Sequence, residues 1–126
     1  MTVVPVLRVS SRATLNQWVL AFGLEPVLVM GEGDVVDHAE LRLGDGWIMA
    51  GTMKDNAFDA ALGGTVTYWS LPDAAAVDAL HVRAVAAGAE SLMEPYAPVY
   101  GGRECSLRDA DGNVWSFGTY APSHAA

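Results

Sequence analysis

Two stretches of the chain, residues 41–49 and 100–120, are predicted to form copies of one β-hairpin with an Asp-Gly turn. The turn glycines Gly46 and Gly112 are 66 positions apart, and two glycines expected to end helices, Gly23 and Gly88, are 65 positions apart. Because two independent landmarks share nearly the same period, the chain is predicted to contain a duplicated module. This duplication limits the fold to arrangements in which two similar units pack together.

Each copy is predicted to have the order strand, helix, strand, strand, strand. The first copy comprises a strand at 3–9, a helix at 13–22 and strands at 26–30, 35–43 and 47–50. After a loop at 51–64, the second copy comprises a strand at 65–71, a helix at 73–87 and strands at 90–93, 103–108 and 113–119.

We therefore expect an α+β fold in a single domain, residues 1–126, with tandem βαβββ modules at about 1–51 and 64–120. One such unit cannot bury both faces of its curved sheet. Two units are therefore expected to form a curved mixed sheet around a cleft, with the helices outside.

Composition narrows the possible partners and the compartment. With 126 residues and a formal net charge of -8, the chain is one acidic domain that would repel a nucleic-acid backbone. Cys105 is the single cysteine, and the segment 1–8 lacks the basic start and apolar core of a signal peptide, so a reduced, cytoplasmic location is expected. Charged residues interrupt every apolar run before it is long enough to span a membrane.

Strand alternation predicts which side chains face the cleft. Apolar residues at alternate positions, such as Leu41, Leu107 and Trp115, are expected to pack beneath the helices. Their neighbours then face the cleft, and the polar or aromatic ones among them are Arg8, His38, Glu40, Arg42, Tyr68, Glu104, Ser106, Arg108 and Ser116.

Several of these side chains are candidates for chemistry. His38 beside Glu40 is either an acid/base pair or an ordinary strand pair on the surface. Three arginines, Arg8, Arg42 and Arg108, form either a clamp for an anion or cross-sheet ion pairs with Glu40 and Glu104.

Three aromatic residues, Trp47, Tyr68 and Tyr100, offer flat surfaces for stacking a planar or cationic guest, although Trp47 could equally serve only to pack its hairpin. His81 and His124 are expected to have no role. Cys105 is expected to lie beneath a helix rather than to act as a nucleophile.

The order of elements and the closing motif resemble the vicinal oxygen chelate superfamily, which includes glyoxalase I, bleomycin-resistance proteins and extradiol dioxygenases. The resemblance covers nearly the whole chain. It rests on the strand-to-helix corners at 9–11 and 71–73, the helix ends at 21–25 and 86–90, the Tyr-Gly-Gly-Arg sequence at 100–103 and the segment Arg-Asp-Ala-Asp-Gly-Asn-Val-Trp at 108–115 with its continuation to Tyr120. The closing motif is typical of a glyoxalase-like subgroup.

The resemblance implies where a metal site would lie. Metal-dependent members take ligands from the first and last strand of each module, and the matching positions here are Val4, Met49, Val66 and Ser116. Two valines, a methionine and a serine do not hold a divalent cation. We therefore expect no metal and no other cofactor.

The resemblance and the residues together predict a homodimer that binds a small organic molecule in the cleft, as a drug-sequestering relative would. The alternative is an enzyme of the superfamily, a lyase, isomerase or dioxygenase, with a rebuilt site around His38 and Glu40. A third interpretation is a structural or regulatory module that binds a protein partner.

Overall fold

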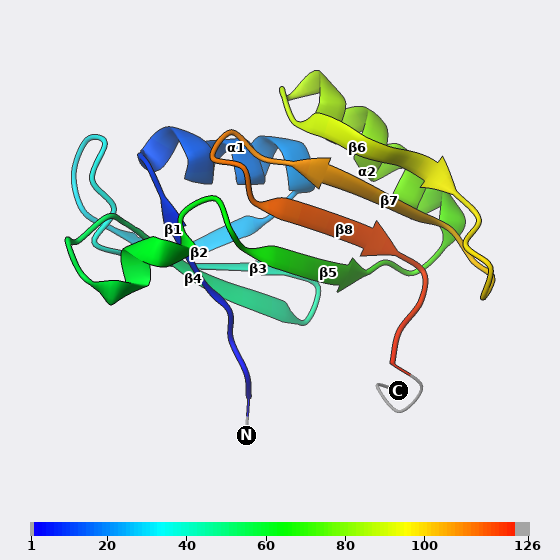
Figure 1. The fold of residues 1–126 in the computed structure, drawn as a ribbon, viewed down its shortest axis with the longest axis horizontal. Helices are drawn as coiled ribbons and strands as arrows, with labels where there is room; N and C mark the ends of the chain where they lie inside the picture. Colours follow the sequence, from blue (N-terminus) through cyan, green and yellow to red (C-terminus); the bar gives the residue numbers. More distant parts are fainter. Residues whose placement is uncertain (1, 123–126) are drawn as a thin grey trace.

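Two four-stranded sheets, each accompanied by one helix, make up the computed structural model, which describes residues 2–122 (Figure 1). The first module contains β1 (Val6–Val9), α1 (Arg12–Phe22), β2 (Glu25–Met30), β3 (His38–Leu43) and β4 (Gly46–Thr52). The second contains β5 (Val66–Ser70), α2 (Ala74–Ala86), β6 (Glu90–Tyr96), β7 (Glu104–Arg108) and β8 (Val114–Gly118). A short 3-10 helix, η1 (Ala57–Ala61), lies in the connection between them.

The two sheets have equivalent topology. Their strand orders are β1-β4-β3-β2 and β5-β8-β7-β6, with the first strand of each module parallel to the last and the other pairs antiparallel. The predicted α+β fold with tandem βαβββ modules is therefore confirmed. The sheets are two separate four-stranded units, not one continuous sheet.

Local sequence signals define both helices. The Ser11 side chain accepts a hydrogen bond from the Ala13 N–H at the start of α1, and Gly23 ends that helix with a left-handed φ of 76°. Asp73 caps α2 by accepting from the Ala76 N–H. The observed helix starts, Arg12 and Ala74, lie within one residue of the predicted ones, because a helix start depends on residues within one turn of it.

Some strand boundaries differ from the predicted ones. β1 begins at Val6 instead of residue 3, and its pairing with β4 starts from the Pro5 carbonyl, which accepts from the Met49 N–H at 3.0 Å. β3 begins at His38, three residues later than predicted, because Val36 is bonded to Thr52. The Val36 N–H donates to Thr52 Oγ1, and the Val36 carbonyl accepts from the Thr52 N–H. β6 continues to Tyr96, past the predicted end at residue 93.

The two modules share one hydrophobic core. Trp18 and Phe22 on α1 contact Trp115 on β8, with ring centroids 5.1 and 4.6 Å apart, so the helix of the first module packs on the sheet of the second. Trp69 on β5 also stacks on Trp115, with 5.8 Å between the ring centroids. The two helices also contact each other and lie along one side of the molecule (Figure 1).

Polar contacts reinforce this junction. Asp109 is buried, and its Oδ2 accepts hydrogen bonds from the indole N–H groups of Trp18 at 2.8 Å and Trp115 at 3.0 Å. Arg83 on α2 donates from Nε to the Leu20 carbonyl at the end of α1, at 2.7 Å.

Neither helix within residues 2–122 is long and apolar enough to cross a membrane.

Candidate functional site

The face of each sheet that points away from the helices, here called the open face, carries most of the candidate residues. Register places Val6, Met49, Glu40 and Leu28 in one row across the first sheet, and Tyr68, Ser116, Ser106 and Met93 in the corresponding row of the second. Large apolar or aromatic side chains are exposed on both open faces, namely Val6, Leu28, Met30, Trp47, Val66, Tyr68, Met93 and Tyr96. The alternate residues Cys105, Leu107, Trp115 and Phe117 are fully buried.

His38 and Glu40 form a hydrogen-bonded pair on the first open face. The His38 Nε2 and Glu40 Oε2 atoms are 2.9 Å apart, and both side chains are a little over one-third exposed. An imidazole held by a carboxylate and open to solvent can accept or deliver a proton. His81, which was expected to have no role, contacts the Ser91 hydroxyl at 2.7 Å, and His124 lies outside the described residues.

The three candidate arginines each pair with a different carboxylate. Arg42 pairs with Glu25 at 3.2 Å and lies 5.7 Å from the Trp47 ring centroid, while Arg108 pairs with Glu90 at 3.3 Å. Arg8 pairs with Asp59, in the connection between the modules. The sequence suggested Glu40 and Glu104 as ion-pair partners, and the observed partners are different residues. The neighbouring strands and the η1 segment supply these carboxylates, which alternation along one strand does not reveal.

All four tyrosines of the chain gather around Glu104 on the second open face. Tyr96 and Tyr100 each donate a hydroxyl hydrogen bond to Glu104 at 2.8 Å, Tyr100 packs edge-on against Tyr120, and Tyr68 donates to the Tyr120 carbonyl. Sequence reasoning missed Tyr96 and Tyr120. Tyr96 lies beyond the predicted strand end at residue 93, whereas β6 continues to Tyr96, which pairs directly with Glu104.

The hydrogen bonds to Glu104 and partial burial raise the pKa values of three of these tyrosines. Because the Tyr100 hydroxyl donates to the Glu104 carboxylate, the pKa of Tyr100 is raised to about 12, and the same contact raises the pKa of Tyr96. The pKa of Tyr68 is raised mainly by burial and also by the charge of Glu104. Tyr68, Tyr96 and Tyr100 are therefore held as neutral phenols beside Glu104.

Ser116 and Ser106 lie next to each other on the same face. Their hydroxyl oxygens are 2.8 Å apart, and register places Tyr68 beside Ser116 on the next strand. This pair can bind a polar group but offers no base or acid of its own.

The positions that would hold the superfamily metal lie in different sheets. Met49 is in β4, opposite Val6 and Glu40, whereas Val66 and Ser116 belong to the second sheet and Val4 precedes β1. Their side chains supply one hydroxyl, one thioether and no imidazole or carboxylate, so they do not fit a divalent ion. Within the part of the chain that the structure describes, no three His, Cys, Asp or Glu side chains are grouped to hold a metal.

Cys105 is unsuited to nucleophilic chemistry. It is fully buried beneath α2, and burial raises the pKa of its thiol to about 11, so the thiol stays protonated.

Two of the hollows that the described residues form beside the open faces contain candidate residues. One, of about 390 Å³, brings Trp47 and Tyr68 to the same depression, together with residues of the N-terminal segment. The other, of about 430 Å³, lies between β1 and η1 and is lined by Val6, Arg8, Ala57, Phe58, Ala60 and Ala61. The sequence predicted a plain loop at 51–64 and so gave no indication of the second hollow.

No protein-family model matches the chain, and no curated protein is significantly similar to it in sequence. Solved structures do match. TioX from Micromonospora sp. ML1 superposes with a TM-score of 0.76 at 23% identity, covering 95% of this chain and 100% of TioX. A glyoxylase/bleomycin resistance protein/dioxygenase domain from Frankia sp. EAN1pec gives 0.74 at 19% identity, covering 96% of this chain and 98% of that one.

A mutant of the fosfomycin resistance protein FosX from Listeria monocytogenes, complexed with Mn(II) and 1S,2S-dihydroxypropylphosphonic acid, superposes with a TM-score of 0.70. Its identity is 15%, and the match covers 96% of this chain and 90% of FosX. The chain thus has the fold of the vicinal oxygen chelate superfamily, and the resemblance predicted from the sequence is confirmed at the level of the fold.

Proposed function

We propose that this protein binds a small organic molecule on its open sheet faces and that it does so without the superfamily metal. The observation that carries the proposal is the exposure of large apolar and aromatic side chains on both open faces, beside charged and hydroxyl groups. Contiguous exposed apolar surface with a few polar groups is typical of ligand and partner sites. FosX, with the same fold, was solved with a small organic acid.

The proposed working form is a homodimer in the cytoplasm. Within one chain the modules meet through their helices and shared core, which leaves the open faces turned away from that junction. Pairing the first module of one protomer with the second module of its partner would cover both faces and enclose a cleft between them. Sedimentation equilibrium should give twice the chain mass, and a monomer at micromolar concentration would contradict this assembly.

A thermal-shift screen of planar aromatic and drug-like compounds tests the binding function. Hits should raise the melting temperature of the wild type and lose most of that effect in Trp47→Ala and Tyr68→Ala, because both side chains line one hollow. Leu20→Ala, an exposed residue on the helix side, serves as the matched control. A library with no hits, or hits unaffected by either aromatic substitution, would count against the site.

Calorimetry tests the metal-free part of the proposal. Zinc, nickel, manganese and iron(II) are each titrated into protein that has been treated with chelator. Because the four equivalent positions lack suitable donors, stoichiometric sub-micromolar binding is not expected. Tight one-to-one binding of any of these ions would overturn this part alone.

A second candidate function is catalysis by the His38–Glu40 pair, favoured by the 2.9 Å contact between them. In that case the reaction would be a proton-transfer step of the lyase or isomerase kind, in which His38 moves a proton and Glu40 orients the ring. His38→Ala and Glu40→Gln should then abolish turnover of a substrate found by screening while leaving folding intact. Unchanged turnover in both variants would rule the assignment out.

A further inference from the structure

Arg8 is a buried cation whose hydrogen-bonding capacity is mostly unused. It is 4% exposed, and its Nε, which makes no hydrogen bond within the described chain, is the atom that faces Asp59, 3.3 Å from Oδ1. Its Nη2 donates one long bond, of 3.4 Å, to the Asn56 side chain. A guanidinium has five N–H donors, and among the described residues only Nη2 makes a hydrogen bond, so the Nη1 donors can serve a ligand.

The space beside Arg8 is a mostly apolar hollow of about 430 Å³. The Phe58 ring, 67% exposed, lies over the guanidinium with 5.5 Å between the ring centroid and Cζ. A neighbouring depression of about 310 Å³ shares Val6, Arg8 and Phe58 and extends to Met49 and His38. This volume is within the range of small-molecule sites, and its apolar walls suit an aromatic or aliphatic body.

A second cation points to the same place. Lys54 is the only lysine of the chain and lines the neighbouring depression. Its Nζ donates to the main-chain carbonyl of Asp37 at 2.7 Å, which leaves its charge without a carboxylate partner in that contact. A Cβ added at Gly51 would lie 3.1 Å from Lys54 Nζ and 3.3 Å from Arg8 Nη1, so both cations converge on one point.

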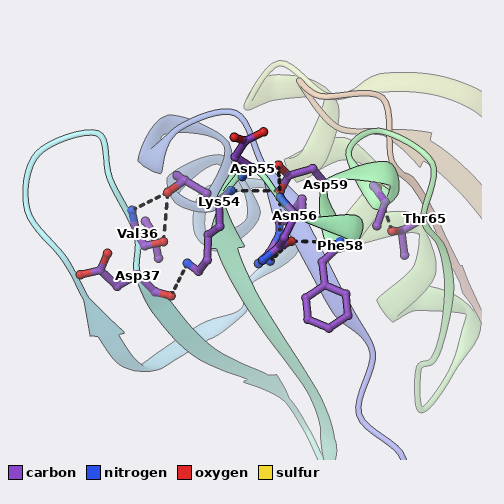
Figure 2. Close-up of polar contacts among 11 residues, drawn as sticks. Val36, Asp37, Lys54, Asp55, Asn56, Phe58, Asp59 and Thr65 are labelled. Atoms are coloured by element: carbon purple, nitrogen blue, oxygen red, sulfur yellow. Dashed lines mark hydrogen bonds and ion pairs between the residues drawn. The ribbon is translucent and has the colours of Figure 1, made fainter.

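The acidic groups nearby are already engaged or turned away. Asp59 is the ion-pair partner of Arg8 through Nε, and it also accepts hydrogen bonds from the main-chain N–H groups of residues 54, 55 and 56, so it does not occupy Arg8 Nη1. Glu40 is bonded to His38. Figure 2 shows the Asp37 carboxylate pointing away from Lys54, while the Lys54 ammonium reaches back to the Asp37 main chain.

We propose that the depression lined by Arg8 and Lys54 binds the carboxylate of a small organic acid. The carboxylate accepts hydrogen bonds from Arg8 Nη1 and Lys54 Nζ, and the apolar body packs against Val6, Met49 and Phe58. The proposal goes beyond the proposed function, because this site shares no residue with the hollow of Trp47 and Tyr68, and it names the chemical class of the ligand bound here. In a chain of net charge -8, two converging cations beside an apolar hollow select an anion at this point.

The test compares three probes of similar size, phenylacetate, phenylacetamide and phenethylamine, in nitrogen-15 NMR titrations of the full chain. Phenylacetate is expected to bind about tenfold more tightly than phenylacetamide, because only the acid can form charge-assisted hydrogen bonds. Phenethylamine should bind more weakly still. The largest shifts should fall on residues 51–58 and on Val6 and Arg8.

Variants assign the preference to the two cations. Lys54→Met should reduce the preference for phenylacetate over phenylacetamide about fivefold while preserving the spectrum elsewhere. Arg8→Met should remove the preference altogether, and if it disorders η1 the Lys54 variant still decides the question. Arg103→Gln, which removes a cation paired with Asp78 on α2, should leave both affinities unchanged.

Equal binding of phenylacetate and phenylacetamide would overturn the carboxylate assignment while leaving small-molecule binding on the open faces intact. Shifts centred on the tyrosines around Glu104 would place the acid elsewhere and overturn it too. Failure of all three probes would also overturn it, whereas the proposed function is judged separately by the compound screen.

Discussion

Glu104 shows how a single side chain organises its surroundings on the second open face. Two tyrosine hydroxyls donate to its two carboxylate oxygens, so the neutral phenols are stabilised relative to their phenolates. Alternation along β7 placed Glu104 on this face from the sequence. The identity of its partners could not be read in the same way, because Tyr96 and Tyr100 come from β6 and the loop after it, and their approach depends on the pairing of two strands.

Replacing Glu104 by Gln should lower the pH at which these tyrosines ionise. In the wild type the pKa of Tyr100 is raised to about 12, so its contribution to stability is present below pH 10 and is lost as the pH rises toward 12. The variant removes the negative charge, so ultraviolet titration of phenolate should move to lower pH. Glu94→Gln, an exposed carboxylate on β6, should leave the titration unchanged, and identical curves for both variants would contradict the assignment.

At the scale of the elements, both helices are specified locally, but the end of α1 is completed by a residue of α2. α1 has its own serine cap and glycine stop, yet no basic residue lies in its last turn to neutralise the C-terminal carbonyls. Arg83 on α2 supplies that charge, bonding the Leu20 carbonyl through Nε and the Val19 carbonyl through Nη2. Sequence alone predicts the two helices and not this contact, which spans more than sixty residues.

Arg83→Met should therefore destabilise the protein by about 1 kcal/mol, because α1 loses two charge-assisted bonds at an exposed site. Urea unfolding followed by tryptophan fluorescence measures the change. Arg83→Lys should recover part of the loss, since it keeps the charge near the helix end without the planar fork. If Arg83→Lys loses as much stability as Arg83→Met, a positive charge at the end of α1 does not contribute to stability.

At the scale of the whole molecule, the junction between modules depends on Asp109. Its carboxylate joins Trp18 of the first module to Trp115 of the second and also fixes its own hairpin turn through the Asn113 side chain. The equivalent first hairpin has an exposed Asp45 in its turn and is tied to the other module differently. There Gly46 leaves room for Trp69, since an added Cβ would lie 2.9 Å from that ring.

Asp109→Ala should destabilise the fold by about 3 kcal/mol, because two buried indole donors lose their acceptor. Urea unfolding gives the free energy, and near-ultraviolet circular dichroism reports the loss of tryptophan order at the junction. Asp45→Ala is the matched control, and as an exposed turn residue it should change stability by less than about 0.5 kcal/mol. Equal effects of the two substitutions would contradict the role of Asp109 at the junction.

The sequence by itself determined the order of elements, the helix ends to within about one residue, and the buried face of the strands whose alternation was clear, such as β3, β7 and β8. Those features depend on residues within a few positions of one another, as with Ser11 and Ala13 or Leu41 and Ile48 on adjacent strands of one hairpin. Only the tertiary structure decided which module's helix covers which sheet, where the four tyrosines meet, and that Arg8 and Lys54 flank a hollow beneath η1. Such contacts join residues far apart in the chain, as Trp18 and Asp109 are, and no local pattern records them.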